Sequence, residues 1–77
     1  MNKVRMKVLK GISEQIESLR DSLQEVLDEE QEAYDNLPEN FQESERGETM
    51  SEGIYQMECA VSSLEEAIDY LDELIWS

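Results

Sequence analysis

One stretch of the chain constrains the fold more than any other, because its apolar residues recur at alternating spacings of four and three. They are Met50, Ile54, Met57, Val61, Leu64, Ile68, Leu71 and Ile75. This seven-residue repeat is typical of a helix that buries one narrow seam against another helix. The stretch therefore predicts a long helix that needs a helical partner.

The preceding part of the chain supplies a matching repeat. Its seam positions alternate by three and four and are apolar apart from one glutamate: Leu9, Ile12, Ile16, Leu19, Leu23, Val26, Glu30, Ala33 and Leu37. In antiparallel order, from Leu37 opposite Met50 to Ile12 opposite Ile75, facing residues have numbers that always add to 87. Eight layers in one register predict an all-α fold, an antiparallel helical hairpin of coiled-coil type. Glu30 either reaches solvent or fixes the register.

The expected organisation is one domain over residues 1–77, with helix one over about 3–36, a linker over about 37–44 and helix two over about 45–76. Pro38 disfavours a helical conformation at the residue before it. Asn36 and Glu39 would cap a short helical turn in the linker, and Phe41 would cover the open end of the seam.

Two helix starts have alternatives. Apolar and basic residues alternate over residues 3–8, as in a strand, but the pattern after Gly11 favours the first turns of a helix. Helix two begins either after Ser44, a good N-terminal cap, or later near Thr49.

A lone hairpin buries only one face of each helix, and such a small core is marginal. Both helices widen their apolar stripe beside the seam. The flanking residues are Leu27, Tyr34, Gly53, Ala60, Ala67 and Leu74. We therefore expect a homodimer in which two hairpins form a four-helix bundle. The alternative is that a different protein covers this flank.

The net charge is −14, and it is unevenly placed. Four basic residues lie in the first ten positions, and the rest of the chain carries 20 acidic residues against two basic ones, a balance of −18. Such a surface repels nucleic acid and anionic membranes and attracts basic proteins. The predicted register sets Arg20 beside Glu65, as a salt bridge. It also brings the four basic residues of the first ten positions close to Asp69, Asp72 and Glu73, whose negative charges they would neutralise.

The composition argues against an enzyme. There is no histidine, which removes the common general base, the usual triads and most zinc sites. Cys59 is expected on the outer face of helix two as an unactivated thiol, and no phosphate-binding loop or dinucleotide motif is present. The acidic run over residues 28–32 lacks the Glu-x-x-His motif of a di-iron site. We expect no catalytic residues, no cofactor and no metal.

Candidate partner-binding residues lie outside the seam. Five acidic residues form a line along helix one: Glu14, Glu17, Asp21, Glu25 and Asp28. Any solvated acidic helix gives such a line, but so does a protein that imitates the phosphates of DNA. Exposed aromatic residues are typical protein-contact anchors, which makes Tyr55, Tyr70 and Trp76 candidates. Alternatively, Trp76 packs across the hairpin end near Leu9 and Met6.

The stretch from Glu32 to Glu48, EAYDNLPENFQESERGE, resembles the linker of small acidic helical-hairpin proteins. These mostly uncharacterised proteins belong to phages and mobile elements of Gram-positive bacteria. The resemblance implies a mobile-element origin and carries no catalytic residues. The linker itself is either an Ω-like cap on the bundle or a recognition surface.

These features favour a non-catalytic, acidic protein-interaction module. Its partner would be a basic host or phage protein, and inhibition of a host defence or nucleic-acid-binding protein by phosphate-mimicking carboxylates is one form of this role. The alternative is a self-assembling scaffold without an external ligand. No apolar run approaches the roughly 20 residues of a membrane span. No continuous apolar block follows the basic N-terminal residues, which argues against a signal peptide. Both features favour the cytoplasm of a bacterial host.

Overall fold

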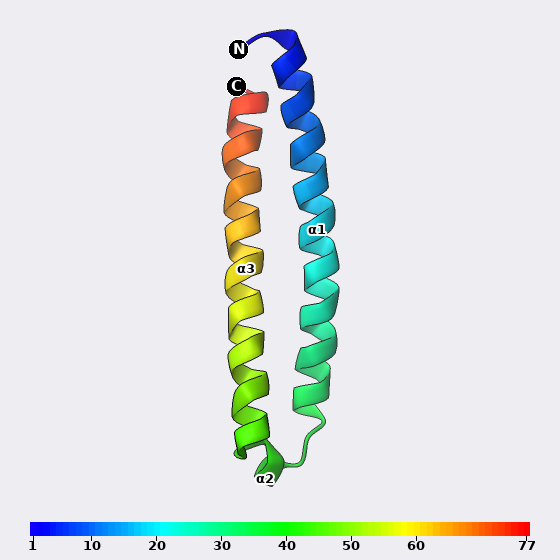
Figure 1. Cartoon of the computed structure of the whole chain (residues 1–77), viewed down its shortest axis with the longest axis vertical. Helices are drawn as coiled ribbons and strands as arrows, with labels where there is room; N and C mark the ends of the chain where they lie inside the picture. Colours follow the sequence, from blue (N-terminus) through cyan, green and yellow to red (C-terminus); the bar gives the residue numbers. More distant parts are fainter.

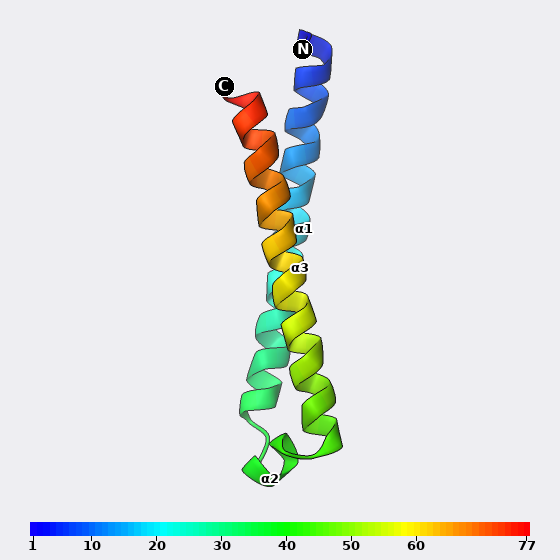
Figure 2. The same ribbon diagram turned by 90° about the vertical axis from the view of Figure 1, so that its left-hand side faces the viewer.

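Two long antiparallel helices joined by a short connection make up the structure, a computed structural model that describes residues 1–77. Helix α1 runs over Lys3–Asp35, α2 over Glu39–Gln42 and α3 over Glu45–Ile75. The body measures 58 × 14 × 14 Å, and both termini lie at one end of it (Figure 1). In the perpendicular view α1 and α3 cross near mid-length (Figure 2). The predicted helical hairpin is confirmed.

Side-chain caps define the starts of both long helices. The residues after Asn2 are the first turns of α1, and the Asn2 side chain accepts a hydrogen bond from the Arg5 amide at 2.9 Å. Helix α3 begins after Ser44, whose hydroxyl accepts from the Gly47 amide at 3.4 Å. The earlier of the two predicted starts is therefore correct, and the Thr49 hydroxyl donates to a carbonyl within α3 instead.

The connection closes the loop end of the hairpin, where α2 contacts α3 (Figure 1). Pro38 precedes α2, which has no side-chain cap, so the predicted capping by Asn36 does not occur. The backbone N–H of Asn36 instead donates to the Glu32 carbonyl in the last turn of α1. The Gln42 amide nitrogen donates to the carbonyls of Tyr34 at 3.0 Å and Leu37 at 3.2 Å. The Tyr34 carbonyl also accepts from the Leu37 backbone N–H at 3.1 Å, so Gln42 adds a second donor there. For the Leu37 carbonyl, which lies beyond the last turn of α1, Gln42 is the donor.

The seam of α3 is the predicted one. Its four best-buried residues are Ile54, Val61, Ile68 and Ile75, and alternate layers hold the half-buried Met50, Met57, Leu64 and Leu71. Ile54 and Val61 form the centre of the core with Leu27 of α1. Leu23, Tyr34 and Met57 pack around this centre.

The seam of α1 needs a correction in alternate layers. Ile12, Leu19 and Val26 were predicted to be buried, but their side chains are 40%, 62% and 52% exposed. Ala33 is exposed as well. Each is replaced in the seam by the residue that follows it: Ser13, Arg20, Leu27 and Tyr34.

The width of the apolar stripe explains this rotation of α1. Three adjacent columns of α1 carry apolar residues, and a single partner helix can cover only about two of them. The column that contains Leu27 and Tyr34 packs against α3, and the column of Ile12, Leu19 and Val26 is left outside. The prediction assumed a narrow seam and so chose the wrong neighbouring column.

Contacts between the helices follow the predicted register to within two residues. Ser13 Oγ donates to Asp72 Oδ1 at 3.3 Å, and Lys10 Nζ lies 4.9 Å from the centre of the Trp76 ring. The prediction for Arg20 is wrong, because its guanidinium pairs with the adjacent Asp21 at 3.1 Å. That is the single ion pair of the structure, so the N-terminal basic residues form none with the acids at the end of α3.

Candidate interaction surfaces

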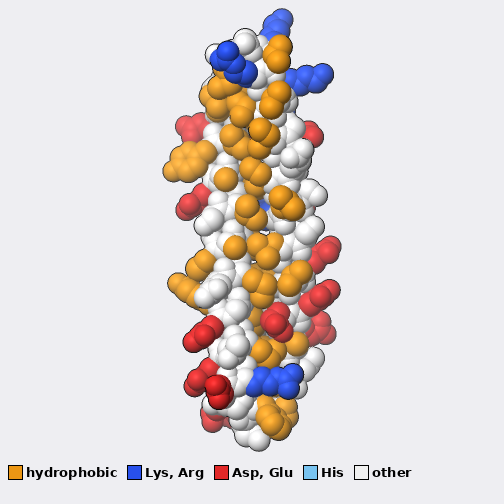
Figure 3. Space-filling model, viewed as in Figure 1, with side chains coloured by type: hydrophobic (Ala, Val, Ile, Leu, Met, Phe, Trp, Pro, Cys, Tyr) orange, Lys and Arg blue, Asp and Glu red, His pale blue; other side chains and the backbone are white.

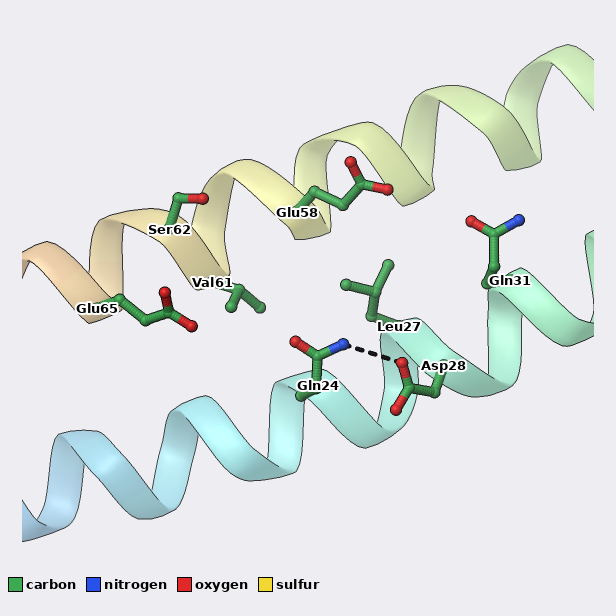
Figure 4. Close-up of a pocket in the computed structure, with 8 residues that line it drawn as sticks. All are labelled: Gln24, Leu27, Asp28, Gln31, Glu58, Val61, Ser62 and Glu65. Atoms are coloured by element: carbon green, nitrogen blue, oxygen red, sulfur yellow. Dashed lines mark hydrogen bonds between the residues drawn. The ribbon is translucent and has the colours of Figure 1, made fainter.

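One flank of the hairpin carries a groove with polar walls. Leu27 and Val61 point toward each other across the space between the helices (Figure 4). Polar side chains surround them: Gln24, Asp28, Gln31, Glu58, Ser62 and Glu65. Gln24 Nε2 donates to Asp28 Oδ1 at 2.9 Å, which fixes the Asp28 carboxylate at the border of the groove. Carboxylates of both helices therefore face the same opening.

A second groove lies nearer the termini. It is lined by Lys10, Ser13, Glu14, Glu17, Asp72, Ile75 and Trp76. Many residues of the two grooves are seven apart, and such residues share one face of a packed helix. We call their common surface the polar flank. It consists of Lys10, Glu14, Glu17, Gln24, Asp28 and Gln31 of α1 with Glu58, Glu65 and Asp72 of α3.

The polar flank includes part of the predicted acidic line. Glu14 and Glu17 line the terminal groove, and Asp28 lines the central one. Asp21 and Glu25 are exposed on the adjoining outer face of α1. The structure thus brings three members of the line next to carboxylates of α3, which the sequence pattern of α1 alone did not show.

The opposite flank is apolar. Ile12, Leu19, Val26 and Ala33 each lie two positions after a polar-flank residue of α1, and two positions are about 200° of helix rotation. Ala60, Ala67 and Leu74 have the same relation to Glu58, Glu65 and Asp72 of α3. Gly53 continues the column of α3, and the exposed Val8, one helical turn before Ile12, lies near the same face of α1; together these residues form the apolar flank. A band of hydrophobic side chains runs along the molecule where α1 and α3 meet (Figure 3).

The predicted dimer flank is thus partly reassigned. Gly53, Ala60, Ala67 and Leu74 lie where the sequence placed them, beside the seam of α3. Leu27 and Tyr34 do not, because Leu27 is only 7% exposed in the core and Tyr34 packs against it. Ile12, Leu19 and Val26 take their place on the surface. Their spacing of seven residues is evident in the sequence, but buried seam residues and exposed flank residues share that spacing.

The three candidate aromatic anchors are all exposed. Tyr70 projects from α3 among Glu66, Asp69 and Glu73. Trp76 is 74% exposed and is held from one side by the Lys10 ammonium, a cation–π contact. It therefore lies against Lys10 at the hairpin end and still presents most of its indole to solvent.

Tyr55 and Cys59 form a small cluster on the outer face of α3. The pKa of Tyr55 is raised, chiefly by a side-chain hydrogen bond with Cys59, then by the charge of Cys59, by burial and by Glu58. The Tyr55 phenol therefore keeps its proton to a higher pH than an ordinary tyrosine does. Cys59 is an exposed free thiol, and the nearest basic residue along α3 is Arg46, 13 positions away.

The structure shows neither a metal-binding cluster nor a membrane-spanning helix. No three His, Cys, Asp or Glu side chains come together in a way that could hold a metal ion. Neither long helix combines the length and the apolar composition that crossing a lipid bilayer requires. No protein-family model, curated protein or solved structure matches this chain. The two flanks are therefore the features of the surface that can bind a partner.

Proposed function

We propose that the chain is a non-catalytic protein-interaction module of a phage or mobile element, acting in the cytoplasm of a bacterial host. Two copies associate into a four-helix bundle, and the acidic outer surface of the bundle binds a basic host or phage protein. The observation that carries this proposal is the separation of the surface into an apolar flank and an acidic polar flank. Each flank suits a different partner.

The apolar flank supports self-association. The hairpin buries only five apolar side chains, which is a small core for a chain of 77 residues. Ile12, Leu19 and Val26 are 40%, 62% and 52% exposed, so covering each would add about half of the 1.5–3 kcal/mol that full burial of such a side chain gives. A long exposed apolar face on a soluble domain is also a common mark of a protein interface.

The polar flank supports a basic partner. Acidic residues of α1 and α3 border the same two grooves, and no basic residue besides Lys10 lines either of them. Carboxylates at regular helical spacing present negative charge much as backbone phosphates do. The resemblance of residues 32–48 to mobile-element proteins makes inhibition of a host defence or nucleic-acid-binding protein the form of this role that we favour.

Quantitative capture of basic proteins from host lysate tests the partner. The test variant neutralises the acidic line by E14Q, E17Q, D21N, E25Q and D28N. The matched control removes five exposed acids elsewhere by E29Q, E32Q, E39Q, E43Q and E52Q. We expect the test variant to retain about tenfold less of a stoichiometric basic partner, and the control to retain nearly all of it. Excess duplex DNA should displace the partner if the carboxylates imitate phosphates.

A self-assembling scaffold without an external ligand is the second candidate, and the length of the apolar flank favours it. Sedimentation mass separates the two proposals. A dimer that captures no basic partner at low or moderate salt supports the scaffold. Equal loss of the partner by both neutralised variants would show that net charge alone, and not the acidic line, attracts it.

A further inference from the structure

Charge is distributed unequally along the hairpin. Residues 22–65, the half that carries the loop, hold 13 acidic residues against Arg46 alone, a balance of −12. The half that carries both termini holds seven acidic and five basic residues, a balance of −2. Lys3, Arg5 and Lys7 are exposed at the extreme end of that half. Basic side chains gather at this end of the molecule, and acidic ones are denser toward the loop (Figure 3).

From this asymmetry we infer that the partner on the apolar flank is a second copy turned end for end, with its loop beside the N-terminal end of the first. The inference rests on the proposed homodimer and adds its arrangement. A two-fold axis perpendicular to the long axis would pass near the level of Ser22 and Leu23. Both copies would then use the same surface, as in most homodimers.

Electrostatics favours this arrangement over two copies in the same direction. Copies in the same direction would set two loop halves, each with a balance of −12, side by side. Packed helices are about 8–10 Å apart, close to the Debye length at physiological salt, so this repulsion is incompletely screened. The inverted copy instead places Lys3, Arg5 and Lys7 at the level of the partner's acidic loop.

Side-chain size favours it as well. The axis lies between residues 22 and 23 of α1, so residues of the two α1 helices that lie at the same level have numbers that add to about 45. Leu19 lies at the level of Val26, and Ile12 at the level of the small Ala33. Copies in the same direction would put Ile12 and Leu74 of both copies in one layer and Ala33 and Gly53 of both copies in another, which crowds one end and leaves a gap at the other.

The available area suits a second copy. A face 58 Å long and 14 Å wide has an area of about 800 Å², which equals the area each partner contributes to a standard interface. The whole length of the hairpin is needed to reach this value. A partner offset along the axis, or one that covers only one end, would contribute less.

Distances between spin labels test the arrangement. In a C59S background, a single nitroxide is placed at N40C or at S22C, both exposed positions without side-chain hydrogen bonds. With a rise of 1.5 Å per residue, the inverted dimer places the two Asn40 labels about 50 Å apart. Copies in the same direction place them within the width of a bundle, about 25 Å. The Ser22 labels lie beside the apolar flank near the proposed axis and should be about 25 Å apart or closer.

Each outcome has a separate meaning. A monomeric sedimentation mass overturns the proposed homodimer, and the inverted arrangement with it. A dimeric mass with a short distance between Asn40 labels keeps the homodimer and overturns the inversion. Long distances for both label positions overturn the use of the apolar flank. Only a long Asn40 distance together with a short Ser22 distance supports the inference.

Discussion

At the scale of single residues, the connection between the long helices depends on a few side chains. The Gln42 amide binds two carbonyls at the end of α1, and the Ser44 hydroxyl caps α3. Gly47 lies buried in the first turn of α3, where an added Cβ would meet the carbonyl oxygens of Phe41 and Gln42. Its φ angle is negative, so space and not backbone conformation requires glycine there. No pattern in the sequence distinguishes Gly47 from Gly11.

Replacing Gly47 by alanine should therefore destabilise the hairpin. Alanine is favoured in helices by about 1 kcal/mol, but two backbone oxygens would have to move, and such overpacking costs about 1–3 kcal/mol. G11A is the matched control, because nothing lies within 4 Å of its new Cβ, and it should raise stability. Denaturant unfolding followed by circular dichroism measures both. A G47A protein as stable as G11A would contradict the close approach of the connection to α3.

At the scale of elements, α3 could be predicted fully and α1 only in part. The α3 seam is bordered by acids on one side and by Gly53, Ala60 and Ala67 on the other, which leaves one rotation that buries large side chains. In α1 the columns of Val26 and of Leu27 are both apolar, and periodicity does not rank them. Their packing against α3 decides, and that depends on three-dimensional fit.

The same limit applies to the candidate surfaces. The acidic line and the small-residue flank of α3 follow from heptad positions on one helix, so the sequence located them. The meeting of Asp28 with Glu58 in one groove depends on the rotation of α1 as well as on register. The contact between Lys10 and Trp76 depends on side-chain conformations at the hairpin end. Patterns within single helices do not determine either.

Two neighbouring alanine substitutions measure the rotation of α1. L27A removes a core side chain and should lower the free energy of unfolding by about 2–4 kcal/mol at any protein concentration. V26A should cost less than about 1 kcal/mol in the isolated hairpin, because its side chain is half exposed there. On the apolar flank, its effect should grow as protein concentration rises and the dimer forms.

Denaturant unfolding at several protein concentrations gives this comparison, with circular dichroism confirming that both variants are helical beforehand. Equal losses for V26A and L27A at the lowest concentration would mean that the seam predicted from sequence is the real one. A V26A effect that does not vary with concentration would instead remove Val26 from any dimer interface.

At the scale of the whole molecule, repulsion between like charges opposes both folding and association. The net charge is −14, and the only ion pair joins Arg20 to the adjacent Asp21. An exposed pair of this kind contributes about 0–1 kcal/mol. Added salt therefore weakens only one attractive ion pair within the hairpin, while it screens the repulsion among many acidic side chains. The same holds between two copies, whose like net charges oppose each other over most of their length.

Added salt should consequently raise the melting temperature of this protein. The Debye length falls from about 30 Å at 0.01 M to about 3 Å at 1 M, and each kcal/mol of relieved repulsion adds about 4–8 °C for a domain of this size. A variant with E29Q, E32Q, E52Q and E58Q loses four exposed acids of the loop half. It should melt higher than the natural sequence at low salt and respond less to added salt. Thermal unfolding by circular dichroism across a sodium chloride series measures both. A melting temperature that falls with salt would mean that attractive charge contacts, and not the apolar seam, hold the two helices together.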